Sequence, residues 1–183
     1  MVDSTDSYKI IDDILSKDLL DTINKTIFTP NFSWYYNEYT VAENPTKYKN
    51  SYEHFQLTHW IVLNSEINSN AVSMLAELIK PLPFNFEQIV RAKLNFLPQY
   101  RVESNRDKHN IPHTDLERKH KVAIIYLDDS DGSTYLFNKD ASILKKVPPQ
   151  TGRVLLFEGH ISHASSHPID SKQRVVFNID YIE

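Results

Sequence analysis

The sequence predicts a single α+β domain, mainly β, in which N-terminal helices support an antiparallel sandwich or jelly roll. Two patterns favour this class: apolar residues at helical spacing occur only in the N-terminal half, and short alternating strands fill the C-terminal half. The length of 183 residues suits one substantial core. We assign residues 1–88 to helical and strand support and residues 89–183 to a core barrel.

Two amphipathic helices are predicted in the supporting half. Apolar residues recur at helical spacing from 14 to 27, with Ser16 near the start, where a helix cap is expected. A second apolar face runs from 70 to 80. Pro81 and Pro83 end it, because proline lacks the N–H that would continue the helix.

Strand patterns dominate from residue 89 onward. Apolar residues alternate with polar ones from 89 to 96, which is the period of a strand. We expect further strands, separated by turn residues, at 34–39, 54–63, 122–127, 133–137, 153–157 and 174–182. The polar stretch 99–111 is long enough to predict a mobile loop of the kind that often forms a lid.

Composition excludes several classes of protein and of site. The chain has no cysteine, so any metal must be held by histidine and carboxylate. It lacks a long apolar run and a basic, then apolar, N-terminus, so we expect a cytoplasmic protein without a membrane segment. A net charge of -4 makes a nucleic acid partner unlikely.

His113 and Asp115 form the first candidate metal-binding pair. Residues at i and i+2 of a strand point to the same face, so the two side chains can grip one cation. The alternative is a surface pair just after Pro112. A strand at 153–157, a turn and then His163 supply a third ligand, with His160 as its rival.

Arg174 follows the third ligand at the start of a strand. Two histidines and one carboxylate on one face of an octahedron leave three positions open, which suits iron with a bidentate 2-oxo acid and O2. A guanidinium can hold the second carboxylate of 2-oxoglutarate through two charge-assisted hydrogen bonds. The alternative is that Arg174 pairs on the surface with Glu158, Asp170 or Asp180.

These residues carry a resemblance to a known family. The segment 112–181 resembles the prolyl 4-hydroxylase-like branch of the Fe(II)/2-oxoglutarate dioxygenases. The His-x-Asp motif of that family matches His113 and Asp115, and its Phe-x-Gly-x-x-x-His motif, counted from Phe157, selects His163 over His160. Its Tyr-Leu-Asn/Asp strand matches 126–128, and its later basic residue matches Arg174.

The resemblance implies a double-stranded β-helix, cupin-like in architecture, and a co-substrate pocket. Tyr126 would bond the co-substrate carboxylate beside Arg174, and Thr134 would line the same pocket. Tyr126 also has the alternative of an ordinary core residue. Asn178 shares the alternation face of Arg174 and either looks into the cavity or simply packs within the strand.

The implied activity is hydroxylation of a substrate C–H bond, coupled to decarboxylation of 2-oxoglutarate to succinate and CO2 with Fe(II) and O2. A prolyl peptide is the leading substrate, and a free amino acid, another small molecule or a nucleobase are alternatives. A jelly-roll binding module without activity and a cupin-like metal enzyme without 2-oxoglutarate are the other classes considered. We expect the remaining nearby histidines to be exposed, or to lie behind the ligands, rather than to bind metal: His109, His120 and His167.

Overall fold

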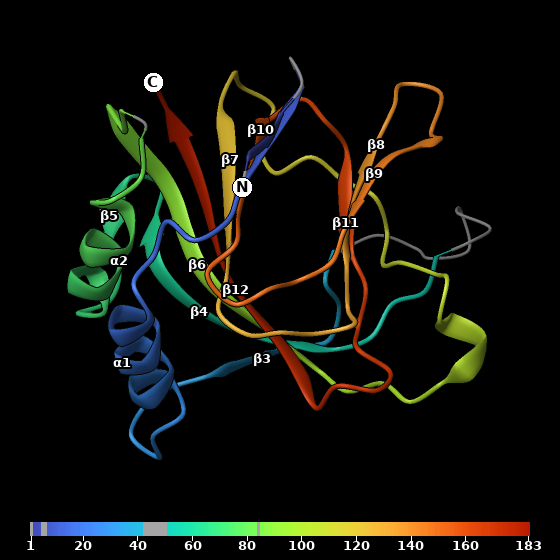
Figure 1. The fold of residues 1–183 in the computed structure, drawn as a ribbon, viewed down its shortest axis with the longest axis horizontal. Helices are drawn as coiled ribbons and strands as arrows, with labels where there is room; N and C mark the ends of the chain where they lie inside the picture. Colours follow the sequence, from blue (N-terminus) through green and yellow to red (C-terminus); the bar gives the residue numbers. More distant parts are fainter. Residues whose placement is uncertain (1, 5–6, 42–50, 84) are drawn as a thin grey trace.

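Two antiparallel sheets face each other, and two helices cover the outside of the larger one (Figure 1). The computed structural model describes residues 2–4, 7–41, 51–83 and 85–183. In this part of the chain, the larger sheet has nine strands, in the order β1 (Val2–Ser4), β2 (Tyr8–Ile11), β10 (Val154–Glu158), β7 (Lys121–Tyr126), β12 (Gln173–Ile182), β6 (Gln88–Pro98), β4 (Gln56–Leu63) and β3 (Tyr35–Asn37), with β5 (Glu66–Ile67) paired to β4. The smaller sheet has the order β11 (His163–Ser165), β8 (Thr134–Phe137) and β9 (Ile143–Val147). This architecture confirms the predicted mainly β jelly roll.

The helices pack against the outer face of the larger sheet. Helix α1 (Lys17–Ile27) begins after Ser16, whose hydroxyl accepts a hydrogen bond from the Leu19 amide at 3.3 Å. This cap explains why the helix starts three residues later than the apolar pattern from 14 predicted. Helix α2 (Val72–Ile79) lies within the predicted 70–80. Both helices bury their apolar faces in one core with β6 and β12, through Ile23, Ile27, Leu75, Leu78, Leu94 and Phe177.

The alternation along β6 decides which side chains lie between the two sheets. Val90, Ala92 and Leu94 are buried on the helix-covered face. The intervening residues therefore point toward the smaller sheet, and Lys93 and Asn95 line a cavity there. Central strands of this fold thus carry a hydrophobic face and a polar face, and the polar face belongs to the cavity.

The sequence patterns missed β1, β2, β5, β9 and β11. Each of these strands is five residues long or shorter, so it offers little alternation to detect. Strand β9 also carries Lys145 and Lys146 and is only partly buried. These strands exist because a neighbour in the sheet pairs with them, and β2, for example, pairs with β10 along the edge of the larger sheet.

The predicted loop at 99–111 contains one turn of 3-10 helix at Glu103–Asn105 and is anchored at its C-terminal end. The backbone N–H of Asn110 donates to the Ser165 carbonyl at 2.7 Å, and Ile111 is fully buried. A role as a lid stays a prediction. None of the helices in the described part of the chain is long and apolar enough to span a membrane.

Candidate metal centre and adjoining cavity

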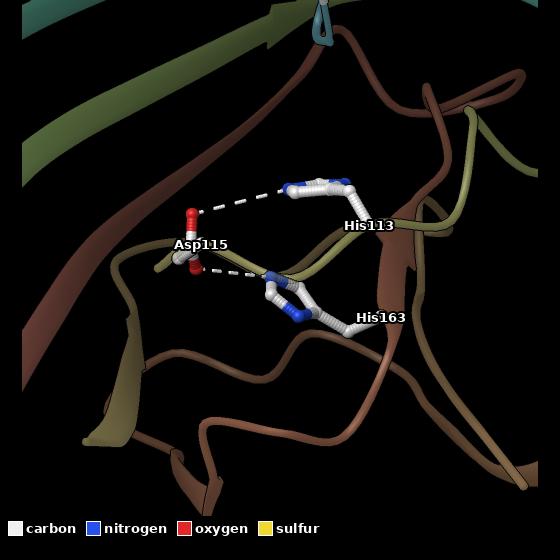
Figure 2. Close-up of side chains that lie close together, drawn as sticks. All are labelled: His113, Asp115 and His163. Carbon is white, nitrogen blue, oxygen red and sulfur yellow. Dashed lines mark ion pairs between the residues drawn. The ribbon is translucent and has the colours of Figure 1, made fainter. Parts of the chain in front are cut away.

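Backbone pairing brings His113 and His163 side by side. The two residues form an isolated antiparallel bridge, with N–H···O distances of 3.0 and 2.8 Å. Each ring places Nδ1 near a backbone carbonyl, that of Ile111 at 3.1 Å for His113 and that of Ile161 at 3.4 Å for His163. With Nδ1 donating there, Nε2 of both rings is the free nitrogen, and both point toward Asp115 (Figure 2).

The Asp115 carboxylate completes a three-ligand cluster. Its Oδ2 lies 3.2 Å from Nε2 of His163, and its Oδ1 lies 4.0 Å from Nε2 of His113. One ligand atom from each residue lies within 4.8 Å of the other two. Metal–ligand bonds of about 2.1 Å at right angles separate two donors by about 3 Å, so a small inward adjustment would suit a divalent ion. The donor set therefore fits such an ion on one face.

The surroundings of His113 and Asp115 favour the protonation states of these two residues that bind metal. Burial, and then the neighbouring His163 ring, lower the pKa of His113 to about 4, so its imidazole is neutral at pH 7. Burial acts to raise the pKa of Asp115, but the His163 imidazole and the Lys93 ammonium hold it well below its usual range. Asp115 is therefore a carboxylate, and its Oδ2 has no hydrogen bond from the described residues.

Arg91 fixes the Asp115 carboxylate from behind. Its Nη2 donates to Oδ1 of Asp115 at 2.6 Å, and its Nε lies 2.8 Å from Oδ2 of Asp180. Burial, and then the Asp115 charge, raise the pKa of Asp180 to about 7. Sequence reasoning did not assign Arg91 to the site. The signal was present in the polar positions that alternate along 89–96, which we had treated only as the non-core face.

At the other end of the cavity, Arg174 forms a buried polar cluster. It is only 2% exposed, and its Nη2 donates to Oγ1 of Thr134 at 2.7 Å. The Tyr126 hydroxyl donates to the same oxygen at 2.7 Å. The backbone packs tightly here, because a Cβ on Gly132 would lie 2.6 Å from the Ser166 carbonyl oxygen and 3.2 Å from Cδ of Arg174. The three predicted co-substrate residues Arg174, Thr134 and Tyr126 therefore lie together.

Arg174 makes none of the surface ion pairs considered for it. Its Nε has no hydrogen-bond partner among the described residues. The three acidic candidates contact other cations instead, in the pairs Glu158–Lys121, Asp170–Arg106 and Asp180–Arg91. A buried guanidinium with spare donors is suited to a carboxylate ligand.

One cavity joins the metal cluster to Arg174. The space between its walls is about 470 Å³, a volume that includes open solvent at its mouth. Its lining includes His113 and His163 of the cluster, together with Thr134, Arg174 and Asn178. Tyr126 is fully buried and reaches the cavity only through Thr134. Sequence reasoning missed Lys93, Asn95 and Gln56, which also line the cavity.

The other histidines lie outside the three-ligand cluster. His160 is exposed and belongs to a separate surface hollow. His109, His120 and His167 are buried, at 7%, 4% and 3% exposed, so of the two places expected for them, in solvent or behind the ligands, the first does not apply. One nitrogen of each ring lies within hydrogen-bond distance of a backbone carbonyl. These carbonyls belong to Asn110 for His109, Arg118 for His120 and Phe55 for His167.

Comparison with known proteins identifies the fold. No protein-family model matches the sequence, and the search of curated proteins gives no match. Among solved structures, a 2OG-Fe(II) oxygenase family oxidoreductase from Burkholderia pseudomallei aligns with a TM-score of 0.71 at 11% identity, over 96% of this chain and 84% of that one. A prolyl hydroxylase from Trichoplax adhaerens, solved with a hypoxia inducible factor peptide, aligns with a TM-score of 0.64 at 14% identity. The alignment covers 97% of this chain and 84% of that one.

A third similar structure contains ligands. HygX from Streptomyces hygroscopicus, solved with nickel and 2-oxoglutarate, aligns with a TM-score of 0.60 at 12% identity over 96% of this chain and 82% of that one. At these identities the likeness concerns the fold and not the activity. The chain therefore has the double-stranded β-helix fold found in 2OG-Fe(II) oxygenases.

Proposed function

We propose that this protein is an Fe(II)- and 2-oxoglutarate-dependent dioxygenase. His113, Asp115 and His163 would hold the ferrous ion, and Arg174 would bind the remote carboxylate of 2-oxoglutarate with Thr134 and Tyr126 beside it. The observation that supports this most strongly is the pairing, in one cavity, of a His-Asp-His cluster with a buried arginine that has no carboxylate partner in the described chain. A cupin-like metal enzyme without 2-oxoglutarate has no need of that arginine.

The residues have separate tasks in this proposal. A ferrous ion bound by three ligands on one face would supply the open positions and the electrons for oxidative decarboxylation of 2-oxoglutarate. His113 and His163 hold their rings in place through the carbonyls behind them, and Arg91 holds Asp115. The walls of the cavity exclude bulk water and position the substrate C–H bond.

A narrower proposal concerns the reaction outcome and the substrate class. We propose hydroxylation of a prolyl residue or a related small substrate, in line with the resemblance of residues 112–181. Support comes from two solved prolyl hydroxylases with this fold, the Trichoplax protein and a Pseudomonas putida prolyl-4-hydroxylase, with a TM-score of 0.59 for the latter.

Succinate release tests the proposal without knowledge of the prime substrate. The purified protein is expected to convert 2-oxoglutarate slowly to succinate when Fe(II), ascorbate and O2 are present, and not when Fe(II) is omitted. Asp115→Ala removes the only carboxylate of the cluster and is expected to abolish this turnover. His160→Ala, at an exposed histidine outside the cluster, is the matched control and is expected to retain it. Turnover that is equal in all three proteins would contradict the proposal, and no binding of metal or 2-oxoglutarate would favour a silent jelly-roll module.

A further inference from the structure

Three polar side chains lie together on one wall of the cavity. They are Lys93 and Asn95 on β6 and Asn178 on β12, and all three line the cavity. Strand register places Asn178 directly opposite Lys93 and Val176 opposite Asn95, so the three form one patch. Within the described part of the chain, the Oδ1 atoms of both asparagines are buried and have no hydrogen-bond partner, and Asn178 is only 7% exposed. Buried polar atoms of this kind are normally satisfied, so the patch calls for a ligand group.

Lys93 brings an unbalanced positive charge to this patch. Its ammonium lies 5.0 Å from the centroid of the Trp60 ring and forms no ion pair with any residue that the structure describes. Burial lowers the pKa of Lys93, and the charges of Asp115 and Asp180, which are both bound by Arg91, act against this lowering. An ammonium that faces a partly desolvated cavity without a counter-ion is costly. The cation is therefore available to a ligand.

Charge balance indicates that this ligand is anionic. At the metal end of the cavity, a divalent ion, Arg91 and Lys93 face the carboxylates of Asp115 and Asp180. With both of these carboxylates ionised, the near carboxylate of a metal-bound 2-oxoglutarate would add one more negative charge, and one positive charge would remain. The cluster, the guanidinium and 2-oxoglutarate together therefore leave the Lys93 ammonium without an anion.

We propose that Lys93, Asn95 and Asn178 form a subsite for the carboxylate of the prime substrate, and that this substrate is a free amino acid. The ammonium would bind the carboxylate, and the amides would supply both a donor and an acceptor to it and to the neighbouring amino or imino N–H. A residue within a peptide has neither a free carboxylate nor a free amine at this position. The inference rests on the proposed function and restricts it to a small substrate.

Calorimetry on the Mn(II)-loaded protein with saturating 2-oxoglutarate tests this subsite directly. The probes are the twenty standard amino acids and their α-amides, with acetyl-prolinamide as a mimic of a prolyl residue in a peptide. At least one free acid is expected to bind, and its amide is expected to bind about 10-fold to 100-fold more weakly, because a charge-assisted hydrogen bond is lost. Lys93→Met is expected to remove this difference, and Lys93→Arg to restore part of it. Lys139→Met, at an exposed lysine far along the chain, is the control and is expected to behave as wild type.

The same titrations define what would overturn the inference. Equal binding of acid and amide, no binding of any free acid, or tighter binding of acetyl-prolinamide than of the acids would each refute the subsite. A loss of about tenfold or more in 2-oxoglutarate affinity in Lys93→Met would assign the lysine to the co-substrate instead. If wild type bound a free acid in a Lys93-dependent way but did not bind 2-oxoglutarate, the subsite would stand and the proposed function would fall. If it bound neither, both would fall.

Discussion

Truncation of Arg174 is the perturbation that best separates a 2-oxoglutarate enzyme from other uses of the same fold. The guanidinium is 2% exposed, one nitrogen donates to Thr134, and Nε has no partner in the described chain. Arg174→Ala removes these donors and leaves a bound carboxylate in a buried pocket with only the Thr134 and Tyr126 hydroxyls. Arg174 is not one of the three residues of the candidate metal cluster, although it lines the same cavity.

The expected magnitude follows from this burial. Removal of one member of a buried, hydrogen-bonded charge pair costs about 2 to 4 kcal/mol, since the other member is left unpaired. With about 1.4 kcal/mol per factor of ten, the dissociation constant of 2-oxoglutarate should rise about 30-fold to 1000-fold. Arg174→Lys should recover only part of the loss, because an ammonium keeps the charge but not the two-pronged geometry. Mn(II) affinity should stay nearly unchanged.

Calorimetric titration of 2-oxoglutarate into the Mn(II)-loaded proteins measures these affinities. Arg106→Ala is the matched control, since that arginine is exposed and pairs with Glu103 and Asp170 on the surface. A thermal melt of each variant separates lost binding from lost folding. Equal 2-oxoglutarate affinities in wild type, Arg174→Ala and Arg174→Lys would refute the clamp.

Three further predictions concern the metal ligands, the cation behind them and one surface turn. His163→Ala should lose stoichiometric Mn(II) binding in equilibrium dialysis while His160→Ala keeps it, and the reverse result would exchange their roles. Arg91→Met leaves the buried carboxylates of Asp115 and Asp180 without their cation. Urea denaturation should therefore show the metal-free protein destabilised by about 3 kcal/mol, and Mn(II) should restore part of this loss. A change in unfolding free energy within experimental error would count against a stabilising role of the two Arg91 ion pairs. Asp131 accepts three backbone N–H bonds that lower its pKa to about 2, although burial opposes them. Asp131→Asn should therefore cost about 1 kcal/mol at pH 7 after allowance for exposure, and the difference should be full above about pH 4 and fade as the pH falls through 2; a constant difference would contradict this.

The sequence already contained the fold class and the main strands. Helical spacing at 14–27 and 70–80 became α1 and α2, and alternation at 89–96 became β6. These predictions succeed because the segments are long and bury one face, so their periodicity is strong. The short strands were lost because pairing with a neighbour, and not their own sequence, makes them strands.

Motif spacing named the candidate ligands, but it could not bring them together. His113 and His163 are fifty residues apart in sequence, and a backbone bridge between them sets their rings 4.6 Å apart. The choice of His163 over His160 came from a resemblance, and the structure buries the first beside Asp115 while the second is exposed. Their roles as metal ligands stay a prediction until metal binding is measured.

The sequence by itself determined the mainly β architecture, the supporting helices and the list of residues with the chemistry for a metal and a 2-oxo acid. Only the tertiary structure decided which polar residues meet. Alternation marked Arg91, Lys93 and Asn95 as one face of a strand, but whether that face meets solvent or a cavity depends on the second sheet packed opposite it. That packing placed Arg91 against Asp115 and left Lys93 without an ion pair among the described residues, because contacts between distant segments are not encoded in local periodicity.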